Sequence, residues 1–241
     1  MHEIRLKLIF LRGILRPPLS LWRYIPIRTI WREFAVWAKY YLAAPDFGSE
    51  CTPWMTFSAV DFLRGKINRD FRVFEYGSGQ STVFFSRHAK EIVSVEHDPQ
   101  WAESVARHLA SEGAKNTTIL SRPPSQKGSG QGSPANPRDY VSGDEFFSGQ
   151  SFFEYASAVD SYQDGFFDLV VIDGRARPSC ALHAMRKVTP GGWLLLDNAD
   201  RPHYRGIHGQ MADWEKHSFV GFGKFNSYVW QTCLWRRPVT G

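Results

Sequence analysis

The sequence predicts an α/β domain built on a doubly wound, mostly parallel sheet. Short apolar runs alternate with segments of helical spacing, and a glycine-containing turn separates the first run from the helix after it. The apolar runs fall near residues 72–76, 92–96, 117–121, 167–172 and 192–196, with helical patterns such as 101–110 and 180–187 between them. Strands that alternate with helices in this way are typical of a parallel sheet with helices on both faces.

The last part of the chain predicts a terminal hairpin. Two aromatic-rich segments, 218–225 and 228–236, are joined by the short Asn226-Ser227 turn. Antiparallel strands need only a short connection, unlike the parallel strands before them. We therefore expect an antiparallel closing strand at the edge of the sheet.

The chain of 241 residues predicts one domain at 51–241 preceded by a helical extension at 1–50. A segment at about 123–150, rich in Gly, Ser, Pro and Gln, interrupts the domain between its third and fourth strands. Such a composition buries little apolar surface, which favours a flexible insertion. A lid over an acceptor pocket is the functional alternative, because the segment leaves the sheet at its carboxyl edge.

Positive charge is concentrated at the N-terminus. Residues 1–45 carry eight Lys or Arg against two Glu, a net of +6, so the rest of the chain is near −1 within a formal total of +5. A nearly neutral body disfavours nucleic acid as a partner. No uninterrupted apolar run in this segment is as long as a membrane span.

Part of this basic segment has the spacing of an amphipathic helix. Its apolar positions are Ile30, Phe34, Trp37 and Tyr41. Three interpretations stay open: packing of the helix on the domain, peripheral contact of residues 1–45 with a membrane surface, and a partner interface. The three cysteines form no C-x-x-C pair, which favours a reducing cytoplasm, with or without attachment to a membrane surface.

The first strand and the turn after it predict a nucleoside-binding βαβ unit. Glu75 ends the strand, Gly77 and Gly79 form the turn, and Ser81-Thr82 open a helix. Glycines let the backbone approach a ligand closely, and the start of the helix offers unpaired N–H groups. Glu96 ends the second strand, 21 positions after Glu75, a distance that suits the two hydroxyls of a ribose.

Two departures from a dinucleotide fingerprint favour S-adenosylmethionine over NAD. Ser81 stands where the third glycine would be, so no pyrophosphate site is required. The carboxylate of Glu75 would repel a phosphate, yet it suits a cofactor that carries a free amino group. A glycine turn without any ligand is the alternative.

These residues resemble motif I and the acidic second-strand end of the class I S-adenosylmethionine-dependent methyltransferases. The run 167–174 resembles the family's fourth strand, and 190–198 resembles its fifth strand after a Pro-Gly-Gly turn. The resemblance covers about residues 51–237 and implies a seven-stranded Rossmann-like methyltransferase fold. It implies cofactor contacts from Glu75, Gly77, Ser78, Gly79, Gln80, Ser81, Thr82, Glu96, His97 and Asp173.

Asp173 after the fourth strand and Asp197-Asn198 after the fifth resemble the metal site of catechol and caffeoyl-CoA O-methyltransferases. Oxygen ligands of this kind suit Mg²⁺, so the resemblance implies a site made by these three residues. The family's lysine base is replaced by Ala176, with Arg175 and Arg177 beside it. Arginine is a poor base and a good clamp for a carboxylate or phosphate. A metal-free arrangement stays open.

The resemblance implies an S-adenosylmethionine-dependent methyltransferase, and we expect O-methylation of a small molecule, a sugar or a lipid-linked glycan. The expected catalytic residues are Asp173, Arg175, Asp197 and His203, where a neutral His203, or else His208, would be the general base. A non-catalytic adenosyl-binding protein, or a scaffold at a membrane surface, is the alternative.

Overall fold

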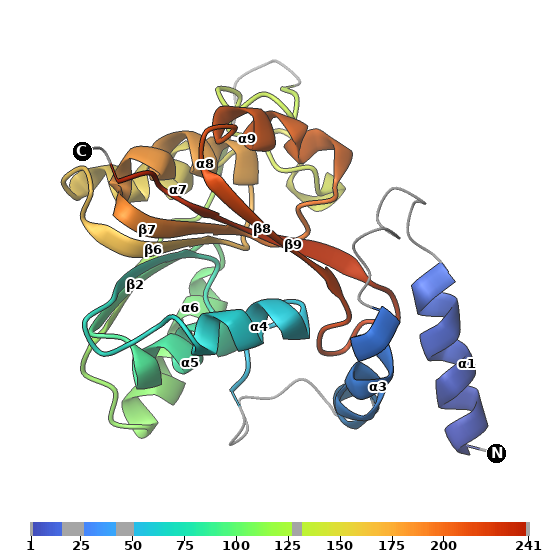
Figure 1. Cartoon of the computed structure of the whole chain (residues 1–241). Coiled ribbons are helices and arrows are strands. Elements are labelled where there is room, and N and C mark those ends of the chain that lie inside the picture. The colour runs from blue at the N-terminus through green and yellow to red at the C-terminus, as the bar shows by residue number, and fades with distance from the viewer. Residues whose placement is uncertain (1, 16–26, 42–50, 127–131, 240–241) are drawn as a thin grey trace.

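The structure is a computed structural model that describes residues 2–15, 27–41, 51–126 and 132–239. Its main sheet has seven strands in the order β3-β2-β1-β6-β7-β9-β8 (Figure 1). The strands of this sheet are β1 (Arg72–Tyr76), β2 (Glu91–Glu96), β3 (Thr117–Ser121), β6 (Phe167–Ile172), β7 (Val188–Leu196), β8 (Glu215–Gly221) and β9 (Trp230–Arg236). Two short strands, β4 (Ser125–Gln126) and β5 (Gln150–Ser151), pair with each other.

The helices are α1 (His2–Leu15), α3 (Ile27–Tyr41), α4 (Phe57–Arg64), α5 (Gln80–His88), α6 (Pro99–Ser111), α7 (Phe153–Ala156), α8 (Arg177–Ala184) and α9 (Arg205–Gln210). Single turns of 3₁₀ helix lie at Glu145–Phe147 (η1), Ser157–Ser161 (η2), Met185–Lys187 (η3) and Pro202–Tyr204 (η4). The start of α6 shows how the sequence sets a boundary. Pro99 takes the first helical position, and the Asp98 carboxylate accepts hydrogen bonds from the N–H groups of Gln100 and Trp101.

The pairing of the strands confirms the predicted sheet. β1, β2, β3, β6 and β7 are parallel, whereas β9 runs antiparallel to both β7 and β8. The five predicted strands and the closing hairpin are all present. The connection of the hairpin is longer than the predicted Asn226-Ser227 turn and spans 222–229; Phe222 and Val229 at its two ends are buried and pack with Phe10 and Trp37.

Helices cover both faces of the sheet, as Figure 1 shows, with α7, α8 and α9 on one face and α4, α5 and α6 on the other. Alternate residues of one strand pack into the two hydrophobic cores, one on each face of the sheet. In β6, Val170 and Ile172 pack in the core beneath α8, whereas Leu169 and Val171 join the core beneath α4 and α5. This period of two explains why a strand buried on both faces reads as a continuous apolar run.

The N-terminal extension packs against the β8–β9 connection. Phe10 of α1 stacks on Phe222 with ring centroids 4.1 Å apart, and Trp37 of α3 is completely buried. The indole N–H of Trp37 donates to the carbonyl of Asn226 at 2.7 Å. Helix α3 therefore packs on the domain, the first of the three predicted roles; the side chain of Ile30 lies outside the described residues. No helix in the described ranges is long and apolar enough to cross a membrane.

The strand order reverses between β1 and β6, the topological switch point of the sheet. Their parallel pairing places Tyr76 beside Ile172, and β6 in turn places Ile172 beside Leu196. The residues that follow these strand ends therefore meet at one edge. In open α/β sheets this edge is where ligands bind.

Candidate active site

A cavity of about 740 Å³ lies at this edge of the sheet. It is lined by the glycine turn, the end of β2, the start of α6, the end of β6 and part of the insertion. The lining residues are Trp54, Gly77, Ser78, Gly79, Gln80, Ser81, Glu96, His97, Asp98, Trp101, Asp144, Phe146, Phe147, Asp173, Gly174, Arg175, Arg177 and Phe225. Eight of the ten predicted cofactor residues therefore line one cavity; Glu75 and Thr82 do not.

The floor of the cavity depends on two glycines. Gly77 has φ +96°, and a Cβ there would lie 3.1 Å from the Cα of Gly174. A Cβ on Gly174 would lie 1.8 Å from the Tyr155 hydroxyl oxygen. The ends of β1 and β6 can approach this closely only because both residues lack side chains.

The carboxylate of Glu96 holds the turn and the end of β2 together. One oxygen accepts from the backbone N–H of Ser78 at 2.8 Å, and the other accepts from the N–H groups of His97 at 2.8 Å and Asp98 at 3.0 Å. Burial by itself would raise the pKa of Glu96, but hydrogen bonds from His97, Asp98 and Ser78 outweigh it and lower the pKa. Glu96 is therefore an ionised acceptor on the wall of the cavity at neutral pH.

Glu75 lies beneath the turn and not on the wall of the cavity. Its side chain is completely buried, and one oxygen accepts from Thr82 Oγ1 at 2.6 Å and from Ser94 Oγ at 3.1 Å. Burial raises the pKa of Glu75 to about 7, although the hydrogen bonds from Thr82 and Ser94 are among the contacts that oppose the rise. Glu75 and Thr82 therefore support the turn from below, and the expected contact of Glu75 with the cofactor's amino group stays a prediction.

Aromatic side chains form the other walls. The indole N–H of Trp101 donates to the carbonyl of Ser78 at 2.8 Å, which holds the ring beside the glycine turn. Trp54 and Phe225 meet edge to face with centroids 5.3 Å apart. Sequence reasoning missed Trp101 and Phe225. The position of Trp101, three residues after the helix-capping Asp98, was the available signal; Phe225 had none.

The predicted metal ligands are already engaged by donors of the protein. The indole N–H of Trp230 and the hydroxyl of Thr232 donate to the carboxylate of Asp197, at 2.9 and 2.5 Å to Oδ1. Asn198 Oδ1 accepts from Arg201 at 2.9 Å. Within the described ranges, no group of three or more His, Cys, Asp or Glu side chains is arranged to hold a metal ion.

A buried guanidinium balances the third predicted ligand. Arg177 lies 3.0 Å from Asp173 Oδ1 and donates to the backbone carbonyls of Asp173, Gly174 and Asp197. Burial raises the pKa values of Asp173 and Asp197, and the charge of Arg177 opposes the rise in both. These oxygens do not fit a shared Mg²⁺ site. The expectation that Arg177 clamps an acceptor is also corrected, because its donors hold the ends of β6 and β7 together.

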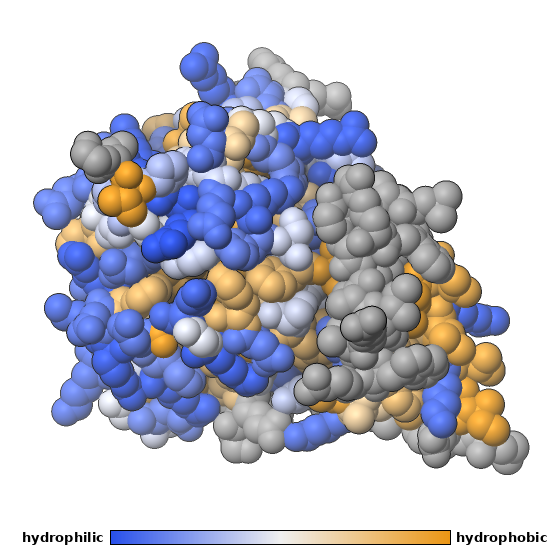
Figure 2. Space-filling view, viewed as in Figure 1, coloured by the Kyte–Doolittle hydropathy of each residue, from blue (hydrophilic) through white to orange (hydrophobic). Residues whose placement is uncertain are grey.

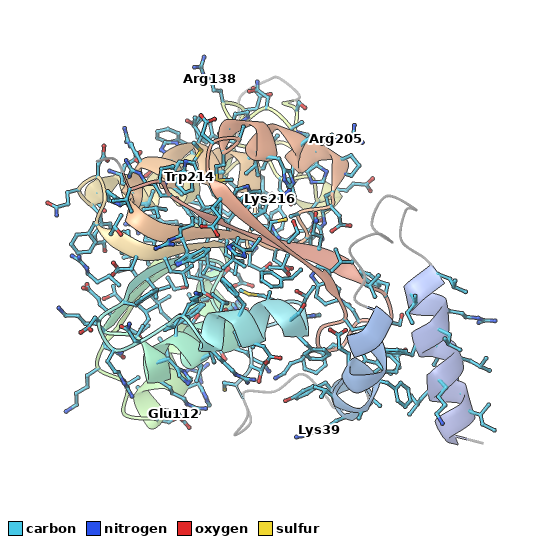
Figure 3. All side chains as sticks on the ribbon, viewed as in Figure 1. Lys39, Glu112, Arg138, Arg205, Trp214 and Lys216 are labelled. Atoms are coloured by element: carbon cyan, nitrogen blue, oxygen red, sulfur yellow. The ribbon has the colours of Figure 1, made fainter. Side chains whose placement is uncertain are left out.

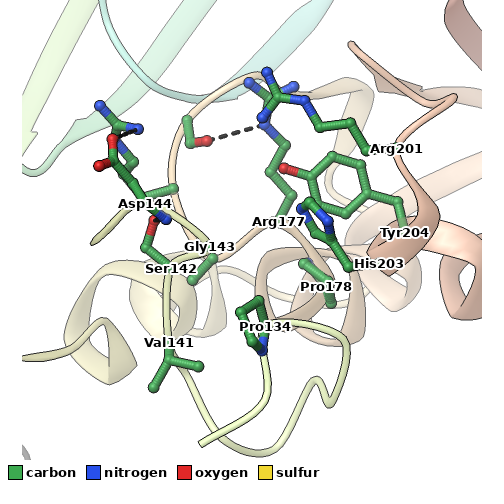
Figure 4. A pocket seen from close by; sticks show the side chains of 13 residues that line it. Pro134, Val141, Ser142, Gly143, Asp144, Arg177, Pro178, Arg201, His203 and Tyr204 are labelled. Carbon is green, nitrogen blue, oxygen red and sulfur yellow. Dashed lines mark hydrogen bonds and ion pairs between the residues drawn. The ribbon is translucent and has the colours of Figure 1, made fainter. Parts of the chain in front are cut away.

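A second cavity of about 340 Å³ adjoins the first (Figure 4). The two cavities share Asp144, Gly174, Arg175 and Arg177. Arg175 pairs with Asp144 at 2.7 Å, so the insertion is tied to the loop after β6. The described part of the insertion thus lines both cavities, which favours the lid interpretation of this segment.

His203 lines the second cavity, as Figure 4 shows. Partial burial lowers its pKa, and the positive charges of Arg201 and Arg177 lower it further. At neutral pH the imidazole is therefore neutral and able to accept a proton. His208, the other predicted base, has both ring nitrogens in contact with protein groups. Nε2 lies 2.9 Å from the carbonyl oxygen of Ala199, and Nδ1 lies 3.0 Å from Lys216 Nζ.

No family model and no curated protein matches the chain. Solved structures do match. A methyltransferase-like protein from Silicibacter pomeroyi is 24% identical, with 77% of this chain and 89% of that chain covered and a TM-score of 0.48. A tRNA (m1A58) methyltransferase from Aquifex aeolicus is 12% identical, with 82% and 78% covered and a TM-score of 0.49. A methyltransferase from Geobacter sulfurreducens is 12% identical, with 88% and 89% covered and a TM-score of 0.48.

The strand order defines the class of fold independently of these similarities. Five parallel strands with a reversal between β1 and β6, closed by the antiparallel β9 inserted between β7 and β8, form the Rossmann-like methyltransferase fold. The N-terminal helices extend this fold beyond the edge of the sheet.

Proposed function

We propose that this protein is an S-adenosylmethionine-dependent methyltransferase that methylates an oxygen atom of a small molecule, a sugar or a lipid-linked glycan. The observation that supports this most is the cavity at the switch point. It combines the glycine turn, the ionised Glu96 and aromatic walls, and it adjoins a second cavity that contains a neutral imidazole.

The residues that line the cavity are suited to binding an adenosyl cofactor. Glu96 is an acceptor for ribose hydroxyls, Trp101 and Phe147 offer flat apolar surfaces for a base, and the Gly77–Gly79 turn brings backbone close to the ligand. Gln80 and Ser81, at the start of α5, add polar atoms to the lining. When bound, S-adenosylmethionine supplies the methyl group that the acceptor oxygen attacks, leaving S-adenosylhomocysteine.

The protein's own contribution is positioning and removal of a proton. His203 accepts the proton of the acceptor hydroxyl, for which a neutral imidazole is suited near pH 7. The pair of Arg175 and Asp144 lies on the boundary between the two cavities and orients the acceptor toward the first one. Holding two reactants in a productive geometry can lower a barrier by roughly 7–11 kcal/mol. No step requires Mg²⁺.

A calorimetric titration with S-adenosylhomocysteine tests the cofactor site. We expect the wild type to bind, and the Glu96→Ala variant to lose at least roughly tenfold in affinity because a charged acceptor is removed. Glu103→Gln is the matched control, since this carboxylate is exposed on α6 outside the cavity. Absence of binding to the wild type would overturn the proposal.

Turnover is tested with S-adenosylmethionine labelled on its methyl group and a panel of hydroxyl-bearing acceptors. Transfer of label that is lost in His203→Asn, with cofactor affinity retained, supports the role of the imidazole. Cofactor binding without transfer to any acceptor would favour the alternative, a non-catalytic adenosyl-binding protein.

A further inference from the structure

The second cavity carries more positive charge than the first. Its ionisable lining consists of three arginines, His203, Tyr204 and a single carboxylate, that of Asp144. Arg175 is balanced by Asp144, and Arg177 is balanced by Asp173, which belongs to the first cavity. The third arginine, Arg201, is not held in a pair of this kind among the described residues; its charge acts on Asp173 at longer range and opposes the rise in the pKa of that carboxyl.

The contacts of Arg201 are with neutral groups. It donates to the amide oxygen of Asn198 at 2.9 Å, and its guanidinium lies 6.0 Å from the ring centre of Tyr204. Asn198 has φ +49°, so the backbone after β7 is turned into the left-handed region where it presents this amide.

Arg201 also acts on His203: partial burial lowers the pKa of this imidazole, and the positive charges of Arg201 and Arg177 lower it further. Figure 4 shows Arg201, His203 and Tyr204 on one wall and the 141–144 segment with Pro134 on the facing side. A guanidinium held in place offers parallel N–H groups that match the oxygens of a carboxylate or phosphate.

We propose that the second cavity binds an oxyanion, a carboxylate or phosphate of the acceptor molecule, through Arg201. This inference rests on the proposed methyltransferase function, because the anion is part of the acceptor and would hold the acceptor beside the cofactor cavity. The remainder of the acceptor extends past Arg175 and Asp144, which line both cavities. Arg201 is therefore a specificity-determining residue that selects acidic acceptors.

The test uses inorganic phosphate and citrate as probes, titrated into the full chain at constant ionic strength. We expect Arg201→Gln to weaken binding of at least one probe by roughly tenfold, because a charge-assisted pair is lost. Arg201→Lys keeps the charge without the fork and should fall between the two. Arg205→Gln is the matched control, an exposed arginine on α9 that is labelled in Figure 3 and lies outside the lining.

The same samples are titrated with S-adenosylhomocysteine, which separates the two proposals. Equal affinity of wild type and Arg201→Gln for both probes would overturn the inference, even where S-adenosylhomocysteine binds. Binding of phosphate or citrate that depends on Arg201, in a protein that does not bind S-adenosylhomocysteine, would support an oxyanion site and overturn the methyltransferase proposal instead.

Helix α1 supports a second, independent inference, because it has two apolar faces. Leu6, Phe10 and Gly13 face the domain and are buried. A second stripe with spacing i, i+4, i+7, i+11 is 38–66% exposed and consists of Ile4, Leu8, Leu11 and Leu15. Figure 2 shows apolar side chains gathered at the outer edge of the molecule where α1 lies.

The positive charges on α1 indicate what kind of surface covers this apolar stripe. Arg5, Lys7 and Arg12 are exposed on the same helix, within the N-terminal segment that holds the chain's excess of positive charge. A surface helix with an apolar stripe and neighbouring cations suits the boundary of an anionic lipid bilayer. We infer that α1 lies on a membrane surface and attaches the domain to it peripherally.

Co-sedimentation with vesicles of phosphatidylcholine, with and without 30% phosphatidylglycerol, tests this inference. We expect the full chain to bind the anionic vesicles, and binding to be lost in Leu8→Gln/Leu15→Gln and weakened in Arg5→Gln/Arg12→Gln. Leu182→Gln/Val239→Gln removes two exposed apolar side chains elsewhere and should bind like the wild type. Equal sedimentation of the wild type and the Leu8/Leu15 variant would overturn the inference. So would a dimer in light scattering that the Leu8/Leu15 variant abolishes, because the stripe would then be a contact between copies.

Discussion

Replacing Glu75 by Gln is expected to remove most of one pH-dependent contribution to stability. One carboxylate oxygen of Glu75 accepts from Thr82 and Ser94, whereas the other is buried without a hydrogen-bond partner. Burial raises its pKa from 4.5 to about 7. A glutamine can keep its oxygen toward the two hydroxyls and place its uncharged amide group where the unpartnered oxygen lies.

The size of the effect follows from the pKa. A rise from 4.5 to about 7 corresponds to roughly 3 kcal/mol, since a tenfold change in an equilibrium constant is about 1.4 kcal/mol. The sign follows from protonation: the folded protein holds the proton more tightly than the unfolded chain. The protonated carboxyl thus stabilises the fold below pH 4.5, and this stabilisation is lost as the pH rises through 7.

Urea unfolding of wild type and Glu75→Gln between about pH 4 and pH 8 measures this contribution. The free energy of unfolding of the variant relative to the wild type should rise by roughly 3 kcal/mol across that range. Other buried carboxyls, such as Glu33, titrate in both proteins and cancel in the difference. Glu103→Gln should show a difference that is independent of pH. A difference for Glu75→Gln that stays constant would refute the assignment of a protonated, buried carboxyl.

Three further changes are expected to have measurable effects. Glu96→Gln should lower the free energy of unfolding by roughly 2 kcal/mol in urea titrations. The amide NH₂ of the glutamine would face one of the backbone N–H groups that donate to the carboxylate in the wild type. Unchanged stability would contradict this prediction. Gly174→Ala should destabilise the fold by several kcal/mol and lower the midpoint of thermal unfolding, since its Cβ would lie 1.8 Å from the Tyr155 oxygen, whereas Gly206→Ala, with open space around it, should have little effect. Addition of Mg²⁺ or of a chelator should leave the affinity for S-adenosylhomocysteine within about twofold, because the oxygens of Asp197 already accept from protein donors; a larger, reversible change would show that a metal site forms.

Sequence reasoning succeeded where the signal was local. The strands, the glycine turn and the closing hairpin follow from period and turn chemistry, and Glu96 follows from its distance from Glu75 along the chain. Sequence reasoning failed where two residues of the same type lie in different environments. The sequence does not distinguish Glu75, which is buried under the turn, from Glu96, which lines the cavity, because both end a strand of the same sheet.

The roles of the arginines show the same limit. Arg175 and Arg177 are two positions apart, yet Arg175 pairs with Asp144 of the insertion while Arg177 is buried against the ends of β6 and β7. Their charges are identical in the sequence. Only the three-dimensional neighbours decide which of them faces a cavity.

The sequence by itself determined the α/β class, the order of the strands along the chain and the glycine turn that lines the cavity at the switch point, because these depend on residues within a few positions of one another. The tertiary structure decided what surrounds that turn. Trp54 meets Phe225, Asp197 is held by Trp230 and Thr232, and the second cavity joins the insertion to the loop after β7. These contacts bring together residues far apart in the chain, and packing and the approach of strand ends, rather than local patterns, select them.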